Sequence, residues 1–95
     1  MRIEVENGYI ELEEGMEPGE LVIEMVEAYE KRTGIGSKLV EMAKEYAKNE
    51  GKYLTLCAYP QDDSIELDEL VAFYDGLGFE VEFDDGSEAL MKWEA

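Results

Sequence analysis

The chain has 95 residues, 45% of them hydrophobic, so we expect one folded domain over residues 1–95 and not a disordered segment. Its 25 acidic and 8 basic residues give a net charge of −17, which argues against binding to nucleic acid or to an anionic membrane. The chain has a single Cys, Cys57, which excludes an internal disulfide. It has no His, the commonest metal ligand. The opening residues do not resemble a signal peptide and no apolar run is long enough to span a membrane, so we expect a cytoplasmic protein without a metal site.

The N-terminal residues predict a β-hairpin. RIEVE and YIELE alternate apolar and charged residues on either side of Asn7-Gly8, a pair that favours a two-residue type I′ turn. A loop rich in Gly and Pro, EEGMEPGE, follows. The next run, LVIEMVEAY from Leu21, is more continuously apolar, which predicts a central strand covered on both faces.

A glycine turn and a helix are expected next. KRTGIGSKL contains Gly34 and Gly36, and the apolar residues beyond it recur at helical spacing as far as Gly51, the expected C′ residue. KYLTLCAY then predicts a second strand, with Cys57 in the core. Strand, glycine turn, helix and strand form a βαβ unit whose two strands should be parallel.

The C-terminal part predicts a second helix and a second hairpin. The helix would bury an apolar stripe that includes Leu67 and Tyr74, with Asp63 or Ser64 as its N-cap and with Gly76 and Gly78 ending it. FEVEF and ALMKW flank a DDG turn, as in a hairpin. The predicted fold class is α+β, a mixed sheet with about two main helices.

The glycine turn is suited to an anion, because a helix N-terminus offers free N–H groups and the positive end of the helix dipole. The chain contains no P-loop sequence, and Leu39 stands where G-x-G-x-x-G needs its third Gly. Lys31, Arg32 and Lys38 cluster at this turn in an otherwise acidic chain. They are either phosphate ligands or ordinary surface cations.

Two motifs resemble those of the GCN5-related N-acetyltransferase (GNAT) family. Lys31, Gly34 and Gly36 match [K/R/Q]-x-x-G-x-[G/A] after a strand, and FYDGLGF, residues 73–79, is similar to the family's second signature. This resemblance implies a compact GNAT-like fold. AYPQDDSI, IEMVE and LMKW extend the likeness over almost the whole chain to a small phage-encoded anti-CRISPR acetyltransferase that modifies type V CRISPR effector nucleases.

The resemblance implies acetyl-coenzyme A (acetyl-CoA) as the acetyl donor. Its pyrophosphate would bind the N–H groups of the glycine turn, and its pantetheine arm would pair with the preceding strand through main-chain hydrogen bonds. The residues that would bind the cofactor are Met25, Val26, Lys31, Arg32, Thr33, Gly34, Ile35, Gly36, Ser37 and Lys38.

Three residues are the predicted catalytic groups. Tyr74, in the family's FY signature, would protonate the leaving thiolate, because a phenol of ordinary pKa about 10 is protonated at neutral pH. Its alternative role is that of a core tyrosine. Glu24 and Glu27 are candidate bases for the acceptor amine, or solvated surface residues. The chain departs from the family at Leu67, where many relatives have Asn.

The resemblance therefore implies a protein lysine N-acetyltransferase that acts as an anti-CRISPR inhibitor in the cytoplasm of the bacterial host. It would acetylate a lysine with which a type V effector nuclease contacts DNA or its PAM. One alternative is an acetyltransferase of another protein or of a small amine. The other is a non-catalytic acidic binder that imitates DNA.

Overall fold

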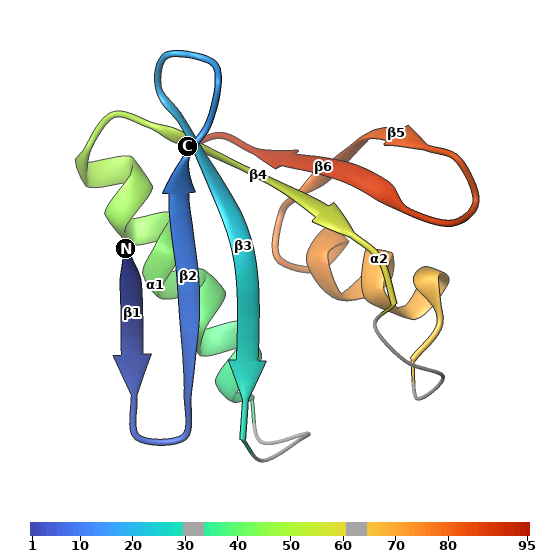
Figure 1. Ribbon diagram of the computed structural model, residues 1–95, viewed down its shortest axis with the longest axis horizontal. Coiled ribbons are helices and arrows are strands. Elements are labelled where there is room, and N and C mark those ends of the chain that lie inside the picture. Colours follow the sequence, from blue (N-terminus) through green and yellow to red (C-terminus); the bar gives the residue numbers. More distant parts are fainter. Residues whose placement is uncertain (30–33, 61–64) are drawn as a thin grey trace.

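A computed structural model describes residues 1–29, 34–60 and 65–95. These residues form one mixed sheet of six strands and two helices (Figure 1). In chain order the elements are β1 (Arg2–Val5), β2 (Gly8–Glu14), β3 (Glu20–Ala28), α1 (Ile35–Asn49), β4 (Tyr53–Ala58), α2 (Leu67–Asp75), β5 (Glu80–Asp84) and β6 (Ala89–Trp93). The strand order is β1-β2-β3-β4-β6-β5. The predicted α+β class and mixed sheet are confirmed.

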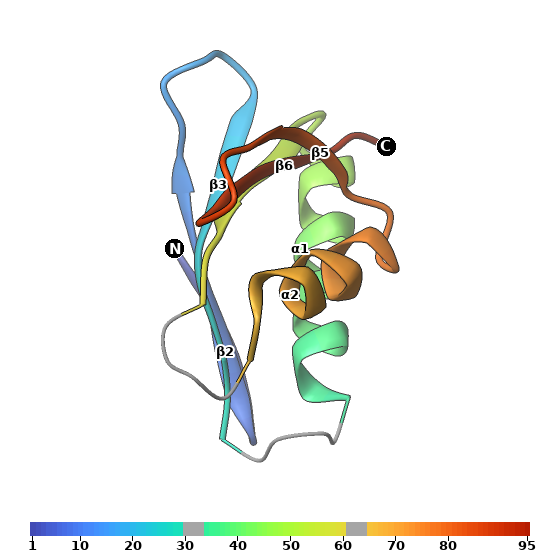
Figure 2. The same ribbon diagram turned by 90° about the vertical axis from the view of Figure 1, so that its right-hand side faces the viewer.

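The centre of the sheet is the predicted βαβ unit. β3 and β4 are parallel and are connected through α1, whereas every other neighbouring pair is antiparallel. Both helices pack on the same face of the sheet, with α1 against β1–β4 and α2 against β4 and β5 (Figure 2). Two right-handed crossovers that advance in one direction across a sheet place their helices on one side. Neither helix is long and apolar enough to cross a membrane.

The opposite face, which we call the helix-free face, is covered by no described helix or strand (Figure 2). The prediction that β3 is covered on both faces is therefore wrong. The prediction that Cys57 lies in the core is wrong for the same reason. Leu54, Leu56 and Ala58 of β4 face the helices and are buried, so the alternation of a strand turns Cys57 to the helix-free face, where it is exposed.

The first hairpin turns at Glu6-Asn7 and not at the predicted Asn7-Gly8, because Val5 pairs with Gly8. In this register Arg2 lies opposite Glu11 and forms an ion pair with it. The predicted turn would have set Glu4 opposite Glu11, and like charges in opposite positions destabilise a sheet. Gly8 serves close packing instead, since a Cβ there would overlap the carbonyl oxygen of Glu27 and lie 3.0 Å from Cγ2 of Ile35.

Both helices end as predicted, at glycines in the left-handed conformation. After α1, Gly51 has φ 68° and Lys52 N–H donates to Ala47 O at 2.8 Å. After α2, Gly78 has φ 94° and Phe79 N–H donates to Tyr74 O at 3.1 Å. These are Schellman motifs, which satisfy carbonyl groups at the last turn of a helix.

The start of α2 differs from the prediction. Its N-cap is Glu66, in an extended conformation and without a side-chain capping bond, and its first turn carries Asp68 and Glu69. The predicted caps, Asp63 and Ser64, lie outside the described residues, and neither is the residue that precedes the helix. Acidic side chains in the first turn stabilise the positive end of the helix dipole without a capping box.

Candidate functional site

β3 and β4 separate towards their carboxyl ends, and the gap between them is the candidate site. The two strands pair from Glu20–Tyr53 to Ile23–Leu56, and beyond that point β3 continues to Ala28 without a pairing partner in β4. Figure 1 shows the two strands diverging after this paired segment. Ligands of open α/β sheets bind at the carboxyl ends of parallel strands, where the topology separates neighbours.

A β-bulge marks the point where the gap opens. Glu11 pairs with Met25, but Leu12 pairs with Ile23, so Glu24 is the extra residue in β3. A bulge bends its strand and changes the direction of the following backbone groups. Sequence reasoning had no signal for it, because neither Gly nor Pro occurs in this part of the strand.

Of the two predicted backbone donors, the geometry places Val26 at the gap. The N–H of Tyr29 donates to the carbonyl oxygen of Asn7, the residue before β2, at 2.8 Å, and successive backbone groups along a strand point to alternate sides. The backbone of Val26 therefore points away from β2, towards the gap. The same alternation directs the N–H of Met25 towards β2, opposite Glu11, so the prediction for Met25 as a donor at the gap is corrected.

The N-terminus of α1 has the geometry that the predicted anion site requires. Gly34, its N-cap, has φ 81°, and no side chain caps the first turn. The amides of Ile35, Gly36 and Ser37 precede the first turn's hydrogen bond, in which Lys38 N–H donates to Gly34 O at 3.0 Å. This turn contains no acidic residue. It can therefore accept an anion despite the net charge of the chain.

Lys38 and the two glycines of this turn fit a phosphate ligand. Lys38 is exposed and forms no ion pair within the described parts of the chain. A Cβ at Gly36 would lie 3.5 Å from Cζ of Phe73, so the glycine sits where α1 and α2 approach each other. A Cβ at Gly34 would meet nothing within 4 Å. The other predicted ligands, Lys31, Arg32 and Thr33, lie outside the described residues.

Tyr74 is buried on the helix-covered face. It is 8% exposed, and its ring makes edge-to-face contacts with Phe73 and Phe79 at centroid distances of 5.0 and 5.7 Å. Burial raises the pKa of Tyr74 to about 12. The phenol therefore remains a proton donor at any physiological pH.

The two predicted bases are exposed at the open part of β3. Glu24 forms the bulge, and Glu27 lies opposite Tyr9 on the helix-free face. Tyr74 and Glu27 thus belong to opposite faces of the sheet. Such an arrangement separates a proton donor on the helix side from a proton acceptor on the other side.

Two further kinds of chemistry are disfavoured among the described residues. Partial desolvation raises the pKa of the Cys57 thiol, and the carboxylate of Glu88, which accepts its S–H at 3.3 Å, raises it further. A thiol with a raised pKa is a poor nucleophile. No group of three or more Cys, Asp or Glu side chains in the described ranges is arranged to hold a metal ion.

Comparison with solved structures places this architecture in a family. The chain is 45% identical to the anti-CRISPR protein AcrVA5, and its structure matches the AcrVA5 crystal structure with a TM-score of 0.83. The match covers 99% of this chain and 97% of AcrVA5. This chain belongs to the AcrVA5 family. The predicted likeness to a small anti-CRISPR protein is confirmed.

More distant neighbours show that this chain has the N-acetyltransferase fold. PaiA N-acetyltransferase from Thermoplasma acidophilum, in complex with coenzyme A, matches with a TM-score of 0.72 and 24% identity over 94% of this chain and 54% of that enzyme. The IAA acetyltransferase from Bacillus cereus ATCC 14579 matches with a TM-score of 0.73 and 22% identity over 94% of this chain and 70% of that enzyme. The GNAT-like fold is thus confirmed, and this chain spans about half the length of the Thermoplasma enzyme. No protein-family model matches the chain, and a comparison with curated proteins gave no match.

Proposed function

We propose that this protein is an N-acetyltransferase that transfers the acetyl group of acetyl-CoA to a lysine of a type V CRISPR effector nuclease. The observation that carries the proposal is the full-length match to the anti-CRISPR protein AcrVA5, at 45% identity. The acetyltransferase fold, the gap beside β3 and the uncapped N-terminus of α1 support the chemistry. The cytoplasm of the bacterial host is the compartment where such an effector would be met.

The chain's residues fit acetyl-CoA, which supplies an activated acetyl thioester. The amides of Ile35, Gly36 and Ser37 would bind the pyrophosphate, with Lys38 beside them. Val26 would hold the pantetheine arm by a main-chain hydrogen bond in the gap. The bound ligand would then lie between the helix-covered face and the open edge of β3.

The catalytic roles follow from the two faces of the sheet. On the helix side, Tyr74 would give its phenolic proton to the departing thiolate, since burial keeps that proton bound. Glu27 on the helix-free side, or Glu24 at the bulge, would accept the proton that the lysine ammonium must lose before it attacks. The new C–N bond forms at the acetyl carbonyl as the C–S bond breaks.

Acetylation would inactivate the effector through its charge. An acetylated lysine loses its positive charge and its ability to form a salt bridge with phosphate. Effectors of this kind recognise a short PAM before the guide pairs with the target, so one modified residue there would block the first step of binding. The identity of this target class rests on the likeness to AcrVA5.

The proposal is tested by incubating the protein and acetyl-CoA with a guide-loaded type V effector, followed by peptide mass spectrometry and a DNA-cleavage assay. We expect one or a few acetylated lysines and loss of cleavage. Tyr74→Phe should bind acetyl-CoA with unchanged affinity while turnover falls by about 10²- to 10⁴-fold, the range of general acid catalysis. Acetyl transfer by Tyr74→Phe at the wild-type rate would remove the phenol from the mechanism.

The high negative charge favours one alternative, a non-catalytic binder that imitates DNA. Such a binder would inhibit the effector without acetyl-CoA and would be indifferent to Tyr74→Phe. Inhibition that requires acetyl-CoA and remains after the protein is removed supports the enzyme.

A further inference from the structure

An apolar stripe crosses the helix-free face. Phe83 on β5 lies opposite Leu90 on β6, and Leu90 lies opposite Cys57 on β4. All three side chains are exposed, Phe83 by 57% and Leu90 by 45%. We call this row the Phe83–Leu90–Cys57 stripe. Apolar side chains aligned across three strands on an uncovered sheet face indicate a contact with a partner.

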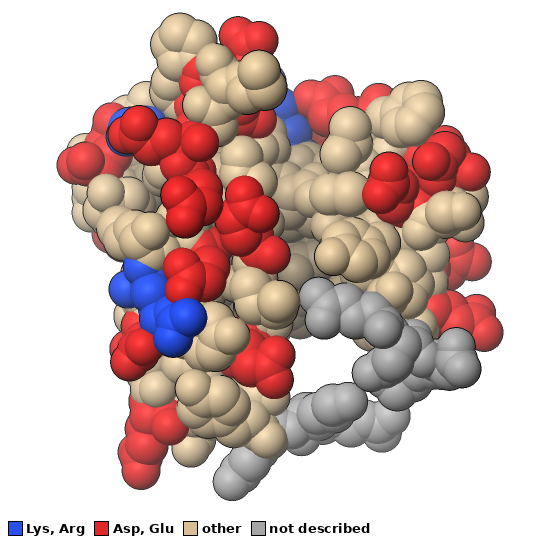
Figure 3. Space-filling view, in the orientation of Figure 1, with Lys and Arg blue, Asp and Glu red and all other residues tan. Residues whose placement is uncertain are grey.

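The stripe begins at the candidate site. Cys57 directly follows Leu56, the last residue of β4 that pairs with β3, so the row starts where the gap opens and runs outward to the edge strand β5. Figure 3 shows the helix-free face, with its surface hollowed between the β1–β3 part and the β4–β6–β5 part. Because α1 and α2 cover the other face, a macromolecular acceptor has access to the gap from the side that carries the stripe.

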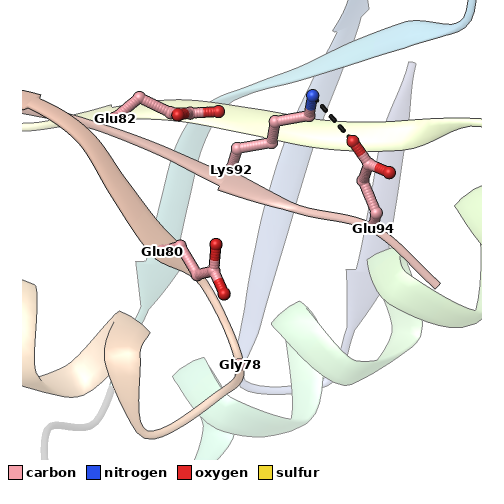
Figure 4. Close-up of a pocket in the computed structure, with 5 residues that line it drawn as sticks. All are labelled: Gly78, Glu80, Glu82, Lys92 and Glu94. Carbon is pink, nitrogen blue, oxygen red and sulfur yellow. Dashed lines mark ion pairs between the residues drawn. The ribbon is translucent and has the colours of Figure 1, made fainter.

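Acidic side chains lie on both sides of the stripe. On one side, Glu80, Glu82 and Glu94 line an open pocket of about 320 Å³ together with Gly78 and Lys92 (Figure 4). Lys92 pairs with Glu94 at 2.7 Å, whereas Glu80 and Glu82 form no ion pair with another described residue. On the other side lies the acidic β5–β6 turn with Asp84, Asp85 and Glu88. The surface thus has an apolar centre and a negative rim.

We propose that the Phe83–Leu90–Cys57 stripe and the adjoining Glu80–Glu82–Glu94 pocket form the docking surface for the acceptor protein. The partner would place an apolar side chain on the stripe and a Lys or Arg side chain in the pocket. This inference rests on the proposed function. A desolvated apolar centre with a charged rim is the usual anatomy of a specific protein interface. The acidic rim would also speed encounter with a basic, DNA-binding surface.

Charge argues against a second copy of the chain on this surface. Each copy carries −17, so self-association would bring two strongly negative surfaces together. The edge strand β5 also carries Glu80, Glu82 and Asp84, and charged residues on an edge strand oppose pairing with another sheet. A nucleic acid would be repelled for the same electrostatic reason.

The test compares exposed apolar residues inside and outside the surface. Phe83→Ser and Leu90→Ser are the test variants, and Met16→Ser is the matched control, because Met16 is 100% exposed in the β2–β3 loop. Binding to an immobilised, guide-loaded type V effector is measured by biolayer interferometry without acetyl-CoA. Calorimetry with coenzyme A and a thermal melt on each variant report whether the fold and the donor site are intact.

We expect Phe83→Ser and Leu90→Ser each to weaken effector binding by about tenfold or more, as loss of a central apolar contact does, and Met16→Ser to leave it unchanged. Coenzyme A affinity should stay at the wild-type value in all three. If a serine variant no longer binds coenzyme A, Glu80→Lys with Glu82→Lys replaces it, and a similar loss of effector affinity is expected.

Wild-type effector affinity in the stripe and pocket variants would overturn the docking surface while leaving the proposed function intact. A wild-type protein that binds the effector but transfers no acetyl group would overturn the proposed function. The effector affinities of the variants would still test the docking surface. Absence of any binding by the wild type would overturn both. Sedimentation that shows a wild-type dimer and a Phe83→Ser monomer would make the stripe a self-association interface, and this also overturns the proposal.

Discussion

Gly36→Ala should make the protein more stable and a weaker binder of coenzyme A. Gly36 occupies the first turn of α1, where alanine is favoured over glycine by about 0.5–1 kcal/mol. The added methyl would lie 3.5 Å from Cζ of Phe73, an ordinary contact distance, so no clash offsets the gain. For a domain of this size the midpoint of thermal unfolding should rise by about 2–8 °C.

We expect the same methyl group to hinder a diphosphate that binds the amides of the first turn, because Gly36 lies within that turn. Loss of one hydrogen bond to a charged group costs about 1.5–3 kcal/mol, which is about a 10- to 100-fold loss of affinity. The assays are urea denaturation for stability and calorimetry with coenzyme A for affinity. A rise in stability together with a fall in coenzyme A affinity would show that Gly36 serves ligand binding and not folding.

Gly51→Ala is the matched control. Gly51 ends the same helix with φ 68°, and a Cβ there would meet nothing within 4 Å, so alanine costs only the left-handed backbone strain of about 1–2 kcal/mol. We expect lower stability and unchanged coenzyme A affinity. Gly36→Ala with undiminished affinity would refute the inference that the first turn of α1 binds the pyrophosphate.

Three further changes probe the framework of the site. Because the folded-state pKa of Tyr74 is raised to about 12, the stability that it contributes is complete below its ordinary pKa of about 10 and is lost as the pH rises through 12. Between pH 10 and 12 the free energy of unfolding, measured with urea, should fall by about 2–3 kcal/mol in the wild type and should not show this fall in Tyr74→Phe. The same pH dependence in both proteins would contradict the raised pKa of Tyr74. Lys44→Met removes the Nζ bond to Leu77 O (2.8 Å) and should lower the free energy of unfolding by about 1–3 kcal/mol in urea denaturation. Gly8→Ala forces a methyl group onto the backbone of Glu27 and should cost about 1–3 kcal/mol, seen as a lower thermal midpoint; a neutral result would show that β2 and β3 can move apart there.

Features set by local chemistry could be predicted from the sequence. The parallel unit, the second hairpin and the ends of both helices follow from glycine positions and from hydrophobic periodicity, and the structure confirms them. The glycine turn was also recognisable, because Gly34 and Gly36 stand between a strand and an amphipathic helix. The residues at its start, Lys31, Arg32 and Thr33, remain predictions.

Features set by tertiary context could not be predicted in this way. Asn7-Gly8 looks like a turn, yet Gly8 is needed where β2 packs on β3 and on Ile35. Cys57 looks like a core residue because LTLCA is apolar, and only the absence of a helix on the second face exposes it. The bulge at Glu24, and with it the choice between Met25 and Val26, depends on cross-strand register, which the sequence of one strand does not contain.

The Schellman motif at the end of α2 gives the FYDGLGF segment a structural role in addition to its proposed catalytic one. Gly78 allows the chain to turn, Phe79 anchors it in the core, and the Phe79 N–H binds the carbonyl of Tyr74 itself. The segment that presents the phenol is thus also the segment that fastens the helix to the last hairpin. A related protein that had lost the acetyltransferase activity would still need Gly78 and Phe79 for folding. It would not need Gly36, because glycine lowers the stability of the helix there.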